Sequence, residues 1–147
     1  MSKQQKYVPA DYAVSQDSLE FDVFVTALLG GIGYWAHTVK YTEADQEGWH
    51  AHVIDIGRDP TVLAEGDWVR VDAETIRSGM KVLAAETDEY REAHRIHPQS
   101  LHARVSYALA SVVASGFTQR DSFEALLDAD SADLVVQAGL LGEVIYG

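Results

Sequence analysis

The spacing of apolar residues changes twice along this chain, and that change constrains the fold more than any other sequence feature. Before residue 40 and after residue 72, apolar side chains recur every three or four residues, the spacing of one face of an α-helix. Between Trp49 and Val71 they alternate, as in β-strands, around two turn signals at Asp59-Pro60 and Gly66-Asp67. We therefore predict an α+β fold, a mostly helical single domain with a small antiparallel β-hairpin or sheet at residues 49–71.

The first predicted helix begins at Asp17, which forms a capping-box pattern with Glu20. Its apolar stripe then enters a glycine-rich stretch at residues 30–33. We expect the helix to continue through this stretch, since apolar residues recur as far as Val39; the alternative is a stop near Leu29. The glycines would then allow close approach of another backbone.

Each later helix is predicted from a capping residue. The expected first residues or caps are Asp72, Ser100, Asp121 with Glu124, and Asp130 or Ser131. Asp133 would lie in the first turn of the last helix, where a carboxylate is favourable to the helix dipole. Residues 86–99 are polar and contain Pro98, so they are expected to form the longest connection. Residues 143–147 are expected to prolong the last helix or to form a short strand.

The length and composition predict one domain inside a cell. A chain of 147 residues has the usual size of a single domain, here expected at residues 17–147 after an irregular N-terminal arm at 1–16. The absence of cysteine fits a reducing compartment. The N-terminus does not resemble a signal peptide, and the longest apolar stretch, residues 23–36, is too short to span a bilayer. We predict a cytoplasmic location and no membrane association.

The chain is strongly acidic, with a formal net charge of −12. Acidic residues are concentrated around the predicted hairpin and after Arg120, beyond which no basic residue occurs. Such a charge disfavours direct contact with nucleic acid, because phosphate binding requires Lys and Arg. It fits a basic protein partner instead.

Three segments together resemble a group of small uncharacterised proteins encoded by bacteriophages of actinobacteria. The segments are residues 26–35 (TALLGGIGYW), residues 71–79 and residues 132–147, which end in LLGEVIYG. The group carries a Gly-Gly-x-x-Tyr-Trp helix, a central hairpin before a helix, and a similar ending. The resemblance implies a phage origin and a location in the host cell. It implies no reaction, since no activity is settled for the group.

The candidate binding residues are four aromatic residues and one amide, Tyr34, Trp35, Trp49, Trp68 and Gln137. Large aromatic side chains serve both as core residues and as anchors of interfaces. Trp49 and Trp68 lie at opposite ends of the predicted hairpin, where they are expected to belong to the core or to flank a binding surface. Gln137 stands among apolar neighbours and needs hydrogen-bond partners, so it is expected to fix the packing of its helix or to contact a ligand.

The sequence contains no recognisable catalytic or metal motif. His94, His97 and His102 are the weak metal candidates, but there is no H-E-x-x-H pattern and Pro98 separates the last of them from the others. No G-x-S-x-G elbow and no Walker lysine accompanies the serines and glycines. We predict no metal and no cofactor, and the sequence favours binding over catalysis.

The resulting hypothesis is a non-catalytic, phage-type accessory protein that binds a host or phage protein through an acidic and aromatic surface. One alternative is a protein or enzyme that binds a nucleotide or a metal in a pocket between the hairpin and the Tyr34–Trp35 region. Another is a DNA mimic whose carboxylates imitate phosphates. A homo-oligomer is compatible with the apolar glycine-rich helix.

Overall fold

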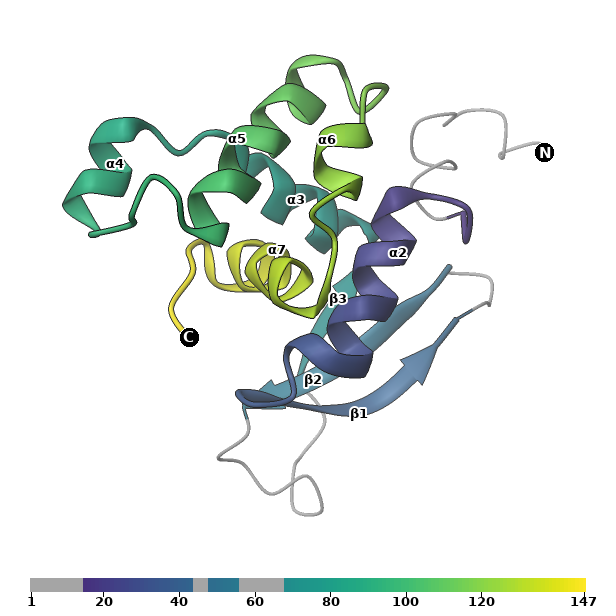
Figure 1. Ribbon diagram of the computed structural model, residues 1–147. Helices are drawn as coiled ribbons and strands as arrows, with labels where there is room; N and C mark the ends of the chain where they lie inside the picture. The colour runs from purple at the N-terminus through teal and green to yellow at the C-terminus, as the bar shows by residue number, and fades with distance from the viewer. Residues whose placement is uncertain (1–14, 44–47, 56–67) are drawn as a thin grey trace.

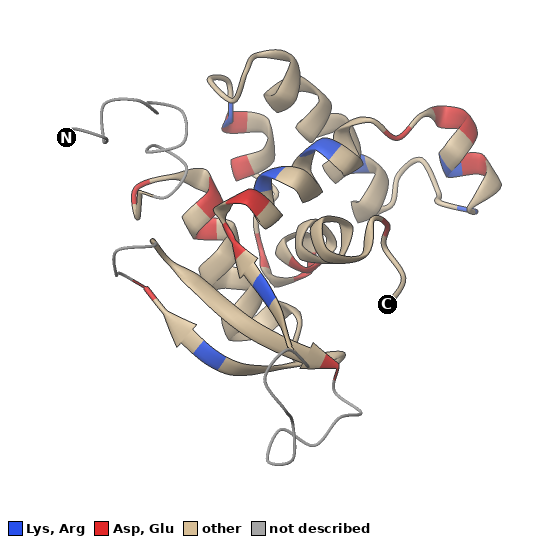
Figure 2. Cartoon of the chain, turned by 180° about the vertical axis from the view of Figure 1, so that it is seen from behind, with Lys and Arg blue, Asp and Glu red and all other residues tan. Residues whose placement is uncertain are grey.

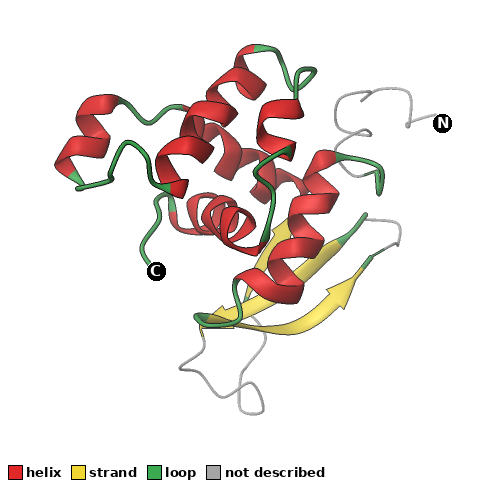
Figure 3. Ribbon diagram, viewed as in Figure 1, coloured by secondary structure: helices red, strands yellow, loops and turns green. Residues whose placement is uncertain are grey.

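The computed structural model describes residues 15–43, 48–55 and 68–147, and it confirms the α+β fold. Helices lie over one face of a three-stranded antiparallel sheet, and α4 projects furthest from it (Figures 1 and 3). The elements in chain order are α2 (Leu19–Thr26), η2 (Ala27–Gly31), β1 (Ala36–Thr42), β2 (His50–Asp55), β3 (Val69–Asp72), α3 (Ala73–Ala84), α4 (Asp88–Ala93), α5 (Leu101–Ala114), α6 (Asp121–Glu124) and α7 (Ala129–Leu141).

The predicted hairpin is present as the pair β2 and β3, but the sheet also contains a third strand that the sequence did not reveal. The strand order is β1-β2-β3, with Val53 opposite Val69 and His50 between Thr42 and Asp72. The register between β1 and β2 shifts between Thr38 and Lys40.

The predicted continuation of the first helix through residues 30–33 is wrong. The α-helix ends at Thr26, a single π-helical turn follows as η2, and Ala36 already begins β1. The glycines do permit a close approach, because a Cβ placed on Gly31 would lie 2.6 Å from the carbonyl oxygen of Ala129. Glycine weakens the helix at this point, and pairing with β2 then determines the structure of the following residues.

The predicted caps at Asp72 and Ser100 are confirmed, whereas the other helices begin one to three residues from the predicted positions. Asp72 accepts a hydrogen bond from the Thr75 amide at 3.1 Å, and Ser100 accepts one from Ala103 at 3.2 Å. The observed caps of the remaining long helices are Ser18 for α2 and Asp128 for α7. Arg120 precedes α6 without a capping side chain. The predicted capping box of Asp17 and Glu20 is therefore not formed.

Two predicted connections also differ in the structure. Residues 86–99 contain the short helix α4, whose cap Thr87 accepts a hydrogen bond from Tyr90 N. Residues 143–147 neither prolong α7 nor form a strand, because Gly142 ends the helix in a left-handed conformation with φ of 81°. A positive φ is accessible to glycine without strain and turns the chain away from the helix axis.

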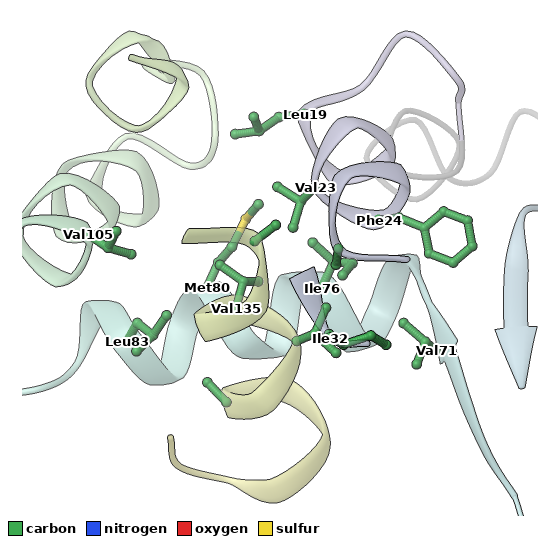
Figure 4. Packing of buried hydrophobic residues seen from close by; sticks show 14 of the residues in the cluster. Leu19, Val23, Phe24, Ile32, Val71, Ile76, Met80, Leu83, Val105 and Val135 are labelled. Carbon is green, nitrogen blue, oxygen red and sulfur yellow. The ribbon is translucent and has the colours of Figure 1, made fainter. Parts of the chain in front are cut away.

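The core forms where α2, α3, α5 and α7 meet above the sheet, and Figure 4 shows Met80 and Val135 side by side at its centre. Helices α3 and α7 approach unusually closely through two glycines. A Cβ on Gly79 would lie 2.0 Å from the carbonyl oxygen of Val135, and one on Gly139 would lie 2.2 Å from that of Thr75. This reciprocal contact places α7 deep in the domain.

Within the described part of the chain, no helix has the length and apolar character needed to cross a membrane. Residues 1–14 of the predicted arm lie outside the described residues, as does most of the acidic stretch around the hairpin.

Candidate functional site

Three of the five predicted binding residues meet around one buried carboxylate. Asp133 accepts hydrogen bonds from the Tyr34 hydroxyl at 2.6 Å and from the Trp35 indole at 2.7 Å. The amide nitrogen of Gln137, one turn further along α7, donates to the same carboxylate at 3.0 Å. These four residues are called the Asp133 network below. Asp133, Trp35 and Gln137 are buried, and Tyr34 is half exposed.

The Asp133 network also binds the end of the described chain, residues 142–147, called the 142–147 segment below. The side-chain oxygen of Gln137 accepts hydrogen bonds from the backbone amides of Ile145 and Tyr146, both at 2.8 Å. Its amide nitrogen donates to the backbone oxygen of Tyr146 at 3.2 Å. The Tyr146 ring stacks on Trp35, with ring centroids 5.2 Å apart and planes inclined by 8°. The segment therefore covers Trp35.

Local backbone structure brings the two halves of the network together. After η2, the amides of Trp35 and Ala36 both donate to the carbonyl oxygen of Ile32, and this turn directs Tyr34 and Trp35 toward α7. The beginning of α7 lies against η2 at Gly31. Asp128 caps α7 through the Ser131 amide at 2.8 Å and so fixes the turn that carries Asp133.

Burial and the neighbouring carboxylate of Asp133 together raise the pKa of Tyr34 to about 12. Burial is the larger cause, and the hydrogen bond to Asp133 adds to it because it favours the protonated phenol. In the described residues no basic side chain pairs with Asp133, and its carboxylate accepts hydrogen bonds from three side-chain donors. The buried polar side-chain atoms of the network all have hydrogen-bond partners within the chain. This arrangement can hold Tyr34 and the 142–147 segment in place, and it contains no activated nucleophile.

The other two predicted binding residues lie apart from this network and from each other. Trp49 is buried against Phe24 and Phe21, with ring centroids 4.5 and 5.6 Å away, and its indole nitrogen has no hydrogen-bond partner in the described residues. It therefore belongs to the core. Trp68 stacks on His52 at the opposite end of the hairpin, with a centroid distance of 3.6 Å.

The three histidines proposed as weak metal candidates each contact a different local partner. His94 Nδ1 lies 2.8 Å from the carbonyl oxygen of Tyr90, and His97 Nδ1 accepts a hydrogen bond from the Gln99 amide at 3.0 Å. His102 lies 2.9 Å from the Glu86 carboxylate. Over the ranges that the structure describes, no three His, Asp or Glu side chains are grouped so that they could hold a metal ion.

A cleft of about 840 Å³ lies between α4, the loop after it and α5, and no pattern in the sequence indicates it. Arg91 anchors α4 at this place by donating to Ser106 at 2.7 Å and to the carbonyl oxygen of Glu86 at 3.0 Å. Its guanidinium carbon also lies over the Tyr107 ring, 4.4 Å from the ring centroid. The charged groups of this cleft are mixed in sign, so it presents no clear preference for one ligand charge.

Exposed side chains lie on η2, in the turn after it that carries Tyr34, and in the 142–147 segment. Tyr34 is 53% exposed, Tyr146 is 37% exposed and Ile145 is 58% exposed, while Leu29 of η2 is 78% exposed. The carboxylate of Asp130 is near enough to contribute to the raised pKa of Tyr34. These five residues are called the Tyr34 rim below. Figure 2 shows no Lys or Arg along α7 or the segment after it.

No protein-family model, no curated protein and no solved structure matches this chain. The interpretation of the Tyr34 rim therefore depends on its geometry and charge.

Proposed function

We propose that this chain is a non-catalytic accessory protein that binds another protein through an acidic and aromatic surface, and that this surface is the Tyr34 rim. The observation that carries the proposal is that Tyr34 is both exposed to solvent and fixed by a hydrogen bond. The residue is 53% exposed, yet its hydroxyl donates a hydrogen bond of 2.6 Å to the buried Asp133.

A fixed, exposed aromatic ring is well suited to an interface. Binding normally costs the ordering of interface side chains, and a ring already held in place avoids part of that cost. Tyrosine is among the residue types that contribute most to binding energy at protein interfaces. The neighbouring Trp35 is itself held by the stack of Tyr146 on its ring and by its hydrogen bond to Asp133.

The charge around the rim favours a basic partner. Asp130 lies on the rim, and the sequence contains no Lys or Arg after Arg120. Complementary charge increases the rate of association and suppresses binding to acidic partners. The interaction should therefore weaken as salt is added.

The biological setting in this proposal is the cytoplasm of a bacterial host during phage infection. The support for it is the resemblance of the Gly-Gly-x-x-Tyr-Trp stretch and of the LLGEVIYG ending to actinobacteriophage proteins. A protein that redirects or blocks a host factor needs a specific surface and no catalytic site of its own.

The test is affinity capture from a host lysate with the wild-type chain and two double variants. Leu29→Ala with Asp130→Lys alters the Tyr34 rim and leaves the Asp133 network intact. Val69→Ala with Glu74→Lys makes comparable changes, one apolar truncation and one charge reversal, on β3 and α3, where Val69 is 52% exposed. We expect a partner that is retained by the wild type and the control, lost with the rim variant, and released by salt. Equal capture by both variants, or no partner at all, would contradict the proposal.

A further inference from the structure

We infer that the cleft between α4, the loop after it and α5 binds a small zwitterion, namely an α-amino acid or a short peptide with an apolar side chain. Its volume of about 840 Å³ falls in the size range of small-molecule sites. The residues that line it are all different from those of the Tyr34 rim, so this inference does not rest on the proposed function.

Arg95 lines the cleft and has a left-handed backbone conformation, with φ of 58°. It lies just after α4, where the Ile96 amide donates to the carbonyl oxygen of Arg91 at 2.8 Å and closes the end of the helix. Glycine is the favoured residue at this position of a helix end, and any side chain there carries a conformational cost. An arginine at this position therefore calls for a compensating role of its side chain.

The fold supplies no such compensation for Arg95. Phe117 is the other non-glycine residue with a positive φ in the described chain, at 70°. Its ring packs against the core, and the Arg77 guanidinium lies 4.1 Å from the ring centroid. The Arg95 side chain is instead exposed, and within the described residues its guanidinium forms no hydrogen bond or ion pair. Its charge thus remains available to a ligand in the cleft.

The charges beside Arg95 indicate the class of ligand. Acidic and basic positions lie next to each other along α4 and the loop after it (Figure 2). Glu89 and Glu92 also line the cleft, and over the described ranges neither carboxylate has a hydrogen bond or an ion pair. A purely anionic ligand would be repelled by these two carboxylates, and a purely cationic ligand by Arg95. A zwitterion satisfies both, with its carboxylate at Arg95 and its ammonium group at Glu89 or Glu92.

His97 adds a second donor for the ligand carboxylate. It lines the cleft two residues after Arg95, and its Nδ1 accepts a hydrogen bond from the Gln99 amide at 3.0 Å. The neutral ring therefore carries its proton on Nε2, which can donate to a carboxylate.

The rest of the cleft is held in shape and partly apolar. Arg91 donates to the Asp88 carboxylate at 2.8 Å, and the Tyr107 hydroxyl donates to it at 3.2 Å. These bonds join α4 to α5 and pair the charges of Arg91 and Asp88 with each other. Ile96, Pro98 and the Tyr107 ring provide apolar lining, which suits an apolar side chain on the ligand.

NMR titration of the isotopically labelled full chain with four probes tests the inference. Leucine and leucyl-leucine carry both charges, N-acetyl-leucine carries only the negative charge, and leucinamide carries only the positive charge. We expect saturable shifts of the amide signals of residues 95–97 with leucine or leucyl-leucine, and the tighter of the two identifies the ligand as an amino acid or a peptide. The singly charged probes should bind roughly tenfold more weakly or worse. No saturable shift with any probe, or equal binding of N-acetyl-leucine, would overturn the inference.

Arg95→Gly separates a binding role from a structural one. Glycine adopts a positive φ without strain, so the midpoint of thermal unfolding should not fall, while binding of the tighter probe should weaken roughly tenfold or more. A lower midpoint, or unchanged binding, would show that the arginine supports the fold and would overturn its assignment to a ligand.

Two further comparisons isolate the charges. Arg95→Gln should weaken binding, whereas Arg104→Gln, at an exposed arginine of α5 that does not line the cleft, should leave it within about twofold of the wild type. Glu89→Gln combined with Glu92→Gln should abolish the preference for leucine over N-acetyl-leucine. A preference that persists in this double variant would contradict recognition of a zwitterion.

Discussion

Trp35 donates its indole N–H to the Asp133 carboxylate across 98 positions of sequence, at 2.7 Å. The residue before it, Tyr34, donates to the other oxygen of the same carboxylate. Asp133 thus joins the turn before the sheet to the last helix, and Gln137 extends that connection to Tyr146. A single carboxylate fixes three parts of the chain.

Asp133→Asn should therefore destabilise the protein by about 2–4 kcal/mol, because an amide replaces one acceptor oxygen with a donor and leaves buried donors unpaired. Urea unfolding measures the loss. The matched control is Asp130→Asn, an exposed position in the first turn of the same helix, with an expected loss of no more than about 1 kcal/mol. Equal losses for the two variants would show that the network contributes nothing beyond the helix dipole.

Stability should fall as the pH rises from 10 to about 12, because the unfolded chain loses its tyrosine protons near pH 10 while folded Tyr34 and Tyr41 keep theirs until about 12. Burial, with Asp133 as the second cause, raises the pKa of Tyr34 from 10.0 to about 12. Burial and Glu43 do the same for Tyr41. A raised pKa stabilises the fold fully below the unfolded value of 10.0, and this contribution is lost as the pH approaches the folded value.

Tyr34→Phe and Tyr41→Phe should each reduce this alkaline loss of stability, since phenylalanine does not titrate. The measurement is the free energy of unfolding at several pH values between about 9 and 12. A wild-type slope that both substitutions leave unchanged would exclude these two tyrosines as its cause.

Gly79→Ala and Gly139→Ala should each cost at least about 2–3 kcal/mol, because the new methyl group would overlap backbone atoms of the facing helix and force α3 and α7 apart. Thermal unfolding measures the effect. Gly33→Ala is the control: a Cβ there meets no atom within 4 Å, and its backbone lacks a positive φ. It should change stability by less than about 1 kcal/mol in either direction.

Arg77→Met should destabilise the fold by about 3–5 kcal/mol, because it leaves the Glu20 carboxylate buried without a charged partner. Glu20 is 1% exposed, and Arg77 Nε lies 2.6 Å from its carboxylate. Adding Glu20→Met should restore much of the loss, since the double variant buries no charge. A double variant that is less stable than Arg77→Met would contradict this account of the pair.

The sequence predicted most successfully those features that depend on neighbouring residues. The caps at Asp72 and Ser100 were predictable because each side chain bonds to a backbone amide three positions later. Strand β1 was not predictable, because glycine-rich residues 30–33 resemble an interrupted helix and pairing with β2 decides the outcome. Local pattern contains no information about such pairing.

The candidate site was predictable only in part, because its residues bond to partners that are distant in the sequence. Tyr34, Trp35 and Gln137 were identifiable as aromatic residues and a buried amide that needed partners. Asp133 was assigned to the helix dipole, because nothing near it in sequence indicates that its bonding partners lie 98 and 99 positions earlier. The role of Tyr146 likewise depends on a stack with Trp35 that only the fold creates.

The wide separation of Trp35 from Asp133 also has a consequence during synthesis. A ribosome that adds about 5–20 residues per second needs roughly 5 to 20 s to proceed from one of these residues to the other. During that interval the indole N–H of Trp35 has no carboxylate to bind, and Gly31 has no α7 to lie against. The nascent chain therefore leaves Trp35 without its acceptor and the side of α2 that packs against α7 uncovered until α7 has emerged, and this interval is when a chaperone or a second nascent copy can bind them.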